Sequence, residues 1–176
     1  MQEKKVYVYF ALFNGYSIFS KIIKFFTRSS YSHVAYCYDE SDFTKVIEVW
    51  LRSYRIKDII QTRWIFNSIH NHSPKTKIEI YRLSVTYDQA VKIKEFFYNL
   101  AMNSVGYNWF GVIAFVLPFW KKGNKNGYFC SEGCVEALKY AGVIPQSVQS
   151  WKYSPDEFLE LILALGAEYV TTIQSL

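Results

Sequence analysis

Cys130 lies at the junction of an apolar, glycine-led segment, Gly127 to Phe129, and a helical segment, Cys130 to Tyr140. A cysteine at a helix N-terminus is close to the first unpaired backbone N–H groups and to the positive end of the helix dipole. Both features lower the pKa of a thiol, and the thiolate is its nucleophilic form. The same N–H groups could bind the oxyanion of a tetrahedral intermediate. Because free cysteines are usually buried structural residues, the position alone does not assign a reaction to Cys130.

His33 and Glu48 lie in two β-rich runs, Tyr31 to Tyr38 and Lys45 to Trp50, that predict an antiparallel hairpin. A loop formed by the polar residues 39 to 42 places His33 directly opposite Glu48, with both side chains on one face. The carboxylate could then accept an imidazole N–H, fix the tautomer and leave the other ring nitrogen for a nucleophile. Without such a partner, His33 would be interpreted as an ordinary core histidine.

The other cysteines and histidines are weaker candidates. Cys134 lies one helical turn beyond Cys130, where no free backbone donors remain, and it is predicted to be a structural residue. His70 and His72 have i, i+2 spacing, but no carboxylate or cysteine accompanies them, so a polar loop is favoured over a metal site. No glycine-rich phosphate-binding pattern is present. The sequence therefore predicts neither a metal nor another cofactor.

Hydrophobic periodicity and capping patterns predict the remaining elements. Capping boxes at Thr86 with Gln89 and at Ser154 with Glu157 mark the starts of two helices. Further elements are a helix at Ser17 to Phe26 and strands at Lys5 to Phe13, Ile78 to Leu83 and Ala167 to Ile173. Strands and helices are mixed without regular βαβ alternation, and no repeat or long linker divides residues 1–176. We therefore expect one α+β domain built on an antiparallel sheet.

Composition restricts the partners and the compartment. Hydrophobic residues make up 51% and charged residues 20% of the chain, a balance that excludes disorder. The formal charge of +5 comes from scattered cations without a nucleic-acid motif, so no nucleic acid is expected as a partner. Three cysteines cannot all pair, and no signal-peptide pattern is present, which favours a cytoplasmic or other intracellular location.

The most apolar window, Trp109 to Trp120, bears on membrane contact. It covers 12 residues and contains Pro118, whereas a membrane-spanning helix needs about 20 apolar residues. No transmembrane segment is therefore expected. The window is predicted to be a core helix, and peripheral contact with a membrane is the alternative.

Three short segments carry a resemblance to a known family. Tyr31-Ser32-His33-Val34-Ala35, Val46-Ile47-Glu48-Val49 and Tyr128-Phe129-Cys130-Ser131-Glu132 resemble the circularly permuted branch of the NlpC-type papain-like cysteine hydrolases. The order His, Glu, Cys is the telling feature, because in papain the cysteine precedes the histidine. Lecithin retinol acyltransferase-like proteins share the permuted order. The resemblance implies a papain-like fold, with Cys130 as nucleophile, His33 as base and Glu48 as the orienting group.

The resemblance implies acyl transfer without a cofactor. The Cys130 thiolate would attack an amide, ester or thioester carbonyl, His33 would protonate the leaving group, and water would hydrolyse the acyl-enzyme. Because similar proteins act on peptide or isopeptide amides or on lipid esters, we expect a peptide, amide or lipid-ester substrate. Two alternatives stay open. One is an acyltransferase with the same three residues, and the other is a non-catalytic binding module on the same fold.

Overall fold

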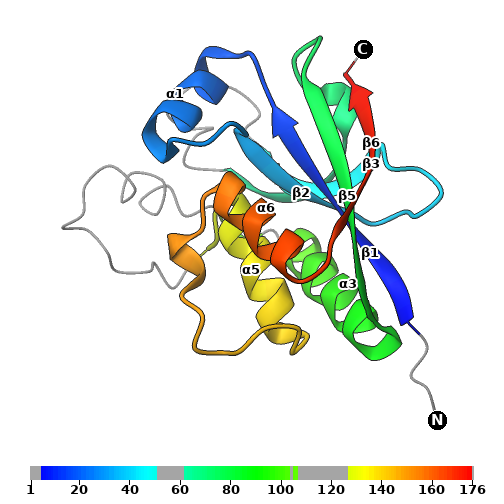
Figure 1. The fold of residues 1–176 in the computed structure, drawn as a ribbon. Coiled ribbons are helices and arrows are strands. Elements are labelled where there is room, and N and C mark those ends of the chain that lie inside the picture. Colours follow the sequence, from blue (N-terminus) through cyan, green and yellow to red (C-terminus); the bar gives the residue numbers. More distant parts are fainter. Residues whose placement is uncertain (1–4, 51–61, 104, 107–126, 176) are drawn as a thin grey trace.

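The computed structural model describes residues 5–50, 62–103, 105–106 and 127–175 (Figure 1). Its centre is a six-stranded sheet with the strand order β4-β3-β2-β1-β5-β6. Every neighbouring pair is antiparallel. The strands are β1 (Lys5–Asn14), β2 (His33–Cys37), β3 (Lys45–Trp50), β4 (Arg63–Ser68), β5 (Lys77–Thr86) and β6 (Glu168–Gln174).

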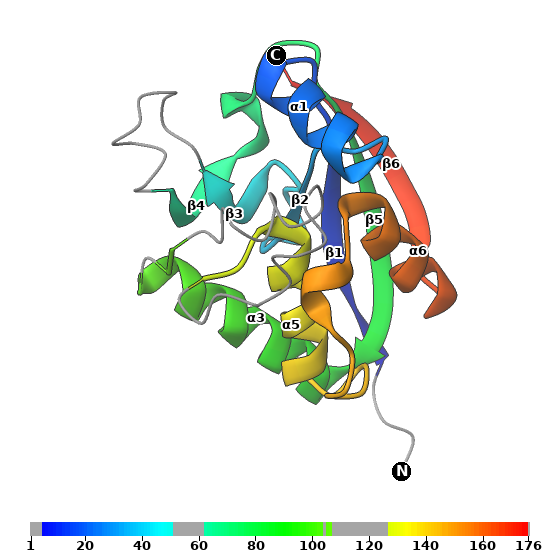
Figure 2. The same cartoon turned by 90° about the vertical axis from the view of Figure 1, so that its left-hand side faces the viewer.

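The helices of the described residues are α1 (Ile18–Thr27), α3 (Tyr87–Met102), α5 (Cys130–Tyr140) and α6 (Pro155–Ala164), with short 3-10 turns η1 (Ile69–Asn71) and η2 (Ser150–Lys152). Helices α3, α5 and α6 lie together on one side of the sheet, whereas α1 lies at one end of the strands (Figure 2). The architecture is therefore α+β on an antiparallel sheet, as the sequence predicts. No helix within the described ranges is long and apolar enough to cross a membrane.

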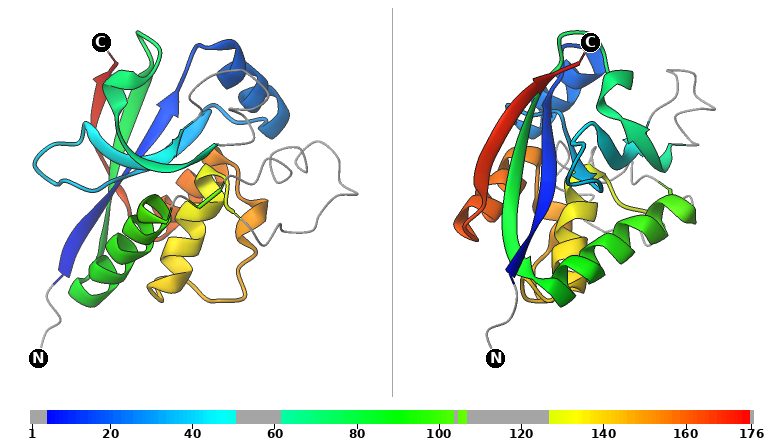
Figure 3. Two further views of the ribbon diagram at one scale, coloured as in Figure 1. Left: turned by 180° about the vertical axis from the view of Figure 1, so that it is seen from behind. Right: turned by 90° about the vertical axis from the view of Figure 1, so that its right-hand side faces the viewer.

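Alternation along the central strands places apolar side chains on both faces of the sheet. Phe10 of β1 and Tyr36 of β2 point toward the helices, where the Tyr36 ring stacks on Phe97 of α3 with centroids 4.5 Å apart. Ala11 and Phe13 belong to a smaller cluster on the opposite face. Figure 3 shows the sheet as a curved layer with helices α3 and α5 beside it. The main core thus lies between the sheet and the helices.

Both predicted capping boxes are present. The Thr86 hydroxyl accepts from the backbone N–H of Gln89, and the Gln89 side chain accepts from the backbone N–H of Thr86. Ser154 and Glu157 make the same reciprocal pair at the start of α6. Each box satisfies two backbone donors that a helix start leaves free, so these helices begin where the sequence predicts.

The β2–β3 hairpin forms, but the register expected from a four-residue loop is wrong. Tyr36 pairs with Ile47, and the Tyr38 N–H donates to the carbonyl of Lys45 at 3.3 Å. The loop is two residues longer because Asp39 and Asp42 each close a local turn. Asp39 accepts from the Ser41 N–H and Asp42 from the Thr44 N–H, both at 3.0 Å. A shift of two residues keeps every side chain on its face, so Glu48 still shares a face with His33.

Strand β4 and turn η1 have no counterpart in the sequence analysis, which predicts no element between Trp50 and Ile78. Strand β4 pairs with β3 along its whole length, from Lys45 opposite Ser68 to Trp50 opposite Arg63. Its apolar residues Trp64, Ile65 and Phe66 are consecutive, so its sequence lacks the apolar alternation that identifies a half-buried strand. The core helix predicted at Trp109 to Trp120 lies outside the described residues.

Candidate active site

The structure brings His33, Glu48 and Cys130 together from three separate elements. His33 begins β2, Glu48 lies within β3, and Cys130 begins α5. Nε2 of His33 is 2.7 Å from Oε2 of Glu48. The Cys130 thiol and the His33 ring lie close enough that each shifts the pKa of the other. Since Nε2 is engaged by the carboxylate, Nδ1 is the ring nitrogen left for the sulfur.

Local contacts fix the start of α5, on which Cys130 depends. Phe129 has an extended backbone, and its N–H donates to Oε2 of Glu132 at 3.2 Å, which ends the preceding segment and begins the helix. The Ser131 hydroxyl donates to the carbonyl of Tyr153 at 2.6 Å. These bonds join the first turn of the helix to the chain on both sides. The Cys130 sulfur is therefore held at the helix N-terminus, as the sequence predicts.

Gly133 allows α5 to approach β4 closely. A Cβ atom at this position would lie 2.4 Å from Cζ2 and 2.8 Å from Cη2 of Trp64. The Trp64 indole is fully buried, and its Nε1 donates to the carbonyl of Tyr128 at 3.3 Å. The indole thus contacts α5 one turn after Cys130 and also fixes the segment before it. A larger side chain at position 133 has no space in this arrangement.

Asp156, in the first turn of α6, positions the residues that lead into β2. Its carboxylate accepts from the backbone N–H of Ser30 at 2.7 Å and from that of Tyr31 at 3.0 Å. The Ser29 hydroxyl also donates to it. The next residue, Ser32, donates its backbone N–H to the carbonyl of Phe13 at 2.8 Å. The backbone immediately before His33 is therefore fixed from both α6 and β1.

The electrostatics of the site favour a charged thiolate. Burial raises the pKa of the Cys130 thiol, but the charge and hydrogen bond of His33, with backbone N–H groups of Val34 and Ser131, outweigh it and lower the pKa. Burial lowers the pKa of His33, but Cys130 and Glu48 raise it overall to about 10. A thiolate beside an imidazolium is the charge state that these opposite changes favour near neutral pH.

The other two cysteines have the opposite character. Cys37 and Cys134 are buried, and burial is the largest influence on both, so it raises the pKa of each thiol. Cys134 lies in the main core with Leu138, which agrees with its predicted structural role. Of the three cysteines, only Cys130 has the lowered pKa that nucleophilic attack requires.

Two further side chains reach Glu48, and the sequence analysis assigns neither of them to the site. Nε2 of His72 is 3.0 Å from both carboxylate oxygens, and Nδ2 of Asn67 donates to Oε1 at 2.7 Å. His72 does lie in a loop, as expected, but its ring turns inward, while His70 is exposed. The one available signal is that a buried carboxylate has more acceptor sites than a single histidine can fill.

These contacts keep Glu48 ionised although it is fully buried. Burial raises the pKa of its carboxyl group, but the charge of His72 and hydrogen bonds from His33 and His72 lower it to about 2. An ionised carboxylate only accepts hydrogen bonds, so Nε2 of His33 must carry the proton that it donates. Within the described ranges, no group of His, Cys, Asp and Glu residues has an arrangement that could hold a metal ion.

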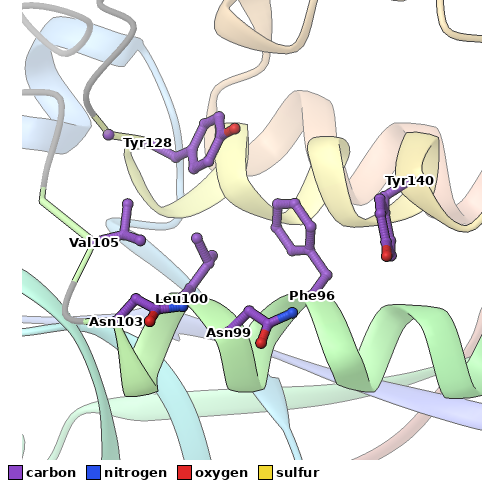
Figure 4. Close-up of a pocket in the computed structure, with 8 residues that line it drawn as sticks. Phe96, Asn99, Leu100, Asn103, Val105, Tyr128 and Tyr140 are labelled. Atoms are coloured by element: carbon purple, nitrogen blue, oxygen red, sulfur yellow. The ribbon is translucent and has the colours of Figure 1, made fainter.

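A pocket of about 320 Å³ lies between α3 and α5 (Figure 4). Its described lining residues are Phe96, Asn99, Leu100, Asn103, Val105, Gly127, Tyr128 and Tyr140. Cys130, His33 and Glu48 are not among them, although Tyr128 precedes Cys130 by two residues. The pocket is therefore a neighbour of the site and does not contain the reactive groups.

Similarity to known proteins does not identify the family. No model of a protein family matches the chain. No curated protein matches it either. The argument for function consequently depends on the geometry around Cys130.

Proposed function

We propose that this protein is a cysteine-dependent hydrolase of the permuted NlpC-type, papain-like class, which cleaves an amide or ester bond through an acyl-enzyme on Cys130. One observation supports this most strongly. A cysteine at a helix N-terminus has its pKa lowered by the neighbouring His33, whose Nε2 is 2.7 Å from the fully buried carboxylate of Glu48. Nucleophile, base and orienting group in this order are the arrangement of thiol-dependent acyl transfer.

The proposed reaction begins from the thiolate–imidazolium pair. The sulfur of Cys130 attacks the substrate carbonyl carbon, and the new oxyanion is bound by N–H groups in the first turn of α5, where helices leave donors free. His33 then gives its Nδ1 proton to the leaving amine or alcohol as the carbon–heteroatom bond breaks. The products of this half-reaction are a thioester on Cys130, a neutral His33 and the free leaving group.

Hydrolysis of the thioester restores the site. Neutral His33 takes a proton from water, whose oxygen attacks the thioester carbonyl and displaces the Cys130 thiolate. Glu48 keeps its charge throughout and holds Nε2–H, so that Nδ1 alone exchanges protons. A peptide, another amide or a lipid ester would supply the carbonyl. No step requires a group beyond these side chains and water.

The overall architecture is compatible with the proposed class. The histidine and the glutamate lie on adjacent antiparallel strands, β2 and β3, and the cysteine begins a helix that follows them in sequence. Helix α5 packs on the sheet through Cys134 and Leu138, which belong to the main core. Sheet and helix thus supply the rigid elements on which a preorganised site depends.

Trapping of the acyl-enzyme tests the proposal. The protein is mixed with p-nitrophenyl acetate or an acyl p-nitroanilide, quenched in acid and mapped by peptide mass spectrometry. One acetyl group should appear on Cys130 and be lost on longer incubation in water. Cys134→Ala is the matched control, because this cysteine is on the same helix and should not affect labelling beyond any loss of stability.

The variants give clear alternatives. Cys130→Ala and His33→Ala should both remove the burst of p-nitrophenol. If Cys130→Ala gives the wild-type burst, the proposal is wrong. If the acetyl group leaves Cys130 only when an alcohol or amine is added, the acceptor is not water and the protein is an acyltransferase.

A further inference from the structure

His72 makes a contact with Glu48 that the three proposed catalytic residues do not require. Its Nε2 lies 3.0 Å from Oε1 and 3.0 Å from Oε2, so a single N–H faces both oxygens. Oε2 also accepts from His33, and Oε1 also accepts from Asn67, each at 2.7 Å. Among these donors His72 alone bridges the two oxygens. Its loss would remove one donor from each carboxylate oxygen and leave His33 on Oε2 and Asn67 on Oε1.

The His72 ring is held in place independently of the carboxylate. It lies against the ring of Phe13, with centroids 4.4 Å apart. With the Trp50 ring it makes an edge-to-face contact, with centroids 5.2 Å apart and an angle of 81° between the ring planes. The His72 N–H donates to the carbonyl of Ile69 at 3.2 Å, and the Ser175 hydroxyl donates to the carbonyl of His72 at 3.1 Å. The backbone and the ring of His72 are therefore both fixed by contacts other than the one with the Glu48 carboxylate.

The chemistry of a buried carboxylate gives this contact a role. Without donors, burial favours the protonated form of Glu48, which carries an O–H and accepts less well. His33 would then lose the acceptor that keeps the proton on Nε2, and its Nδ1 would no longer be reserved for Cys130. Among the described residues, Glu48 also adds to the burial that raises the pKa of Cys37, which lies on the same face of β2 as His33.

We propose that His72 is a positioning residue, which acts through Glu48 to hold His33 in the tautomer that faces Cys130. This inference rests on the proposed thiol chemistry for its purpose, though not for its geometry. The functional unit then has four members, from Cys130 through His33 and Glu48 to His72. Asn67, outside this unit, supports it by donating to the remaining lone pair of Oε1.

Two substitutions of His72 separate its hydrogen bond from its charge. His72→Phe keeps an aromatic ring beside Phe13 but removes the donor, whereas His72→Gln restores a neutral N–H donor. The rate of Cys130 alkylation by iodoacetamide is measured against pH by peptide mass mapping. Exposed His70, on the neighbouring turn η1, supplies the control His70→Phe.

The expected result is a shift of the acid limb of the alkylation profile, which is the pH range where the rate rises as the Cys130 thiol ionises. In His72→Phe the limb should move up by about one pH unit, which slows alkylation below the limb about tenfold. Above the limb the rate should equal that of the wild type, because the thiol is then ionised in every variant. His72→Gln should shift the limb by roughly half as much, since it restores the bond without the charge. His70→Phe should keep the wild-type profile.

Nitrogen NMR of the histidine rings reads the His33 tautomer directly and separates this inference from the proposed function. The spectra are recorded above the His33 pKa of about 10, where the ring is neutral: in the wild type the single proton should be on Nε2, and in His72→Phe part of it should move to Nδ1. If wild-type Cys130 alkylates like an ordinary thiol, the proposed function fails, and the His33 tautomer still decides the role of His72.

Unchanged alkylation and an unchanged His33 tautomer in His72→Phe, with only a lower melting temperature, would show that His72 is merely structural and overturn the inference. If His72→Phe does not fold, the same unchanged result in His72→Gln overturns it.

Discussion

Replacement of Gly133 by alanine tests the packing that holds Cys130 in position. The added methyl carbon would lie 2.4 Å from Cζ2 of Trp64, whereas carbon atoms in contact are separated by about 3.5–4.0 Å. The indole is fully buried, and its Nε1 is hydrogen-bonded to the carbonyl of Tyr128. Either the indole or the first turns of α5 must therefore move by about 1 Å to reach ordinary carbon–carbon contact.

Two opposing effects set the size of the change in stability. Overpacking a well-filled core costs about 1–3 kcal/mol, and a required displacement of this size places Gly133→Ala near the upper value. Alanine in a helix interior gains about 1 kcal/mol over glycine. The free energy of unfolding should therefore fall by about 2 kcal/mol. For a chain of this length the melting temperature should fall by about 4–8 °C.

Thermal and urea unfolding followed by circular dichroism measure this effect. Trp64→Phe, which shortens the ring, should offset part of the loss in the Gly133→Ala background, so the two substitutions should not be additive. The alkylation rate of Cys130 should also fall in Gly133→Ala because the helix start moves relative to His33. A Gly133→Ala variant as stable as the wild type would refute the close approach of Trp64 to α5.

Three further predictions concern the thiols and Glu48. Iodoacetamide near pH 7 should label Cys130 well before Cys37 or Cys134, since only Cys130 has a lowered pKa; equal labelling in peptide maps would contradict the assignment. Glu48→Gln should keep the fold but slow acyl turnover about tenfold, less than Cys130→Ala does, because a neutral acceptor supports His33 more weakly than a carboxylate; full activity would exclude Glu48 from the site. The lowered pKa of Glu48 contributes stability that is complete above its usual value of 4.5 and is lost as pH falls toward about 2. On acidification, the free energy of unfolding measured in urea should therefore fall by about 3 kcal/mol less in Glu48→Gln than in the wild type. An identical fall in both proteins would contradict the charged state of Glu48.

The elements predicted most accurately are those with local signals. The helix after Thr86 begins at its capping box and buries Ile93, Phe97 and Leu100 on one face, as the apolar spacing indicates. Helix α6 begins after Ser154 for the same reason. Capping and periodicity act over a few residues, so the chain itself contains all the information that these starts require.

The β2–β3 register shows where local reasoning fails. The sequence identifies both strands, but the loop length depends on which side chains close turns within it. Asp39 and Asp42 each accept backbone N–H groups and extend the loop to residues 39–44. The resulting error is two residues, which leaves His33 and Glu48 on the same face and within hydrogen-bond reach. An error of one residue would have separated them.

Contacts between distant residues could not be derived from composition or periodicity. The sequence next to His72 does not indicate that its side chain reaches Glu48. That contact depends on the pairing of β4 with β3 and on the turn η1 that follows. Cys130 and His33 are much farther apart in sequence than His72 and Glu48. Their proximity is expected only from the order of motifs in a resembling family, and in the structure the two side chains are close enough to shift each other's pKa.

Asp156 also has a consequence for the order in which the protein is made. Because a ribosome adds about 5–20 residues per second, residue 156 is made roughly 6–25 s after residue 33. During that interval the backbone of Ser30 and Tyr31 lacks the carboxylate that accepts its N–H groups in the folded protein. These N–H groups therefore gain their carboxylate acceptor only once α6 has been translated and docked. Until then the segment that leads to His33 lacks one of its two anchors, and the other is the bond from the Ser32 N–H to the carbonyl of Phe13 in β1.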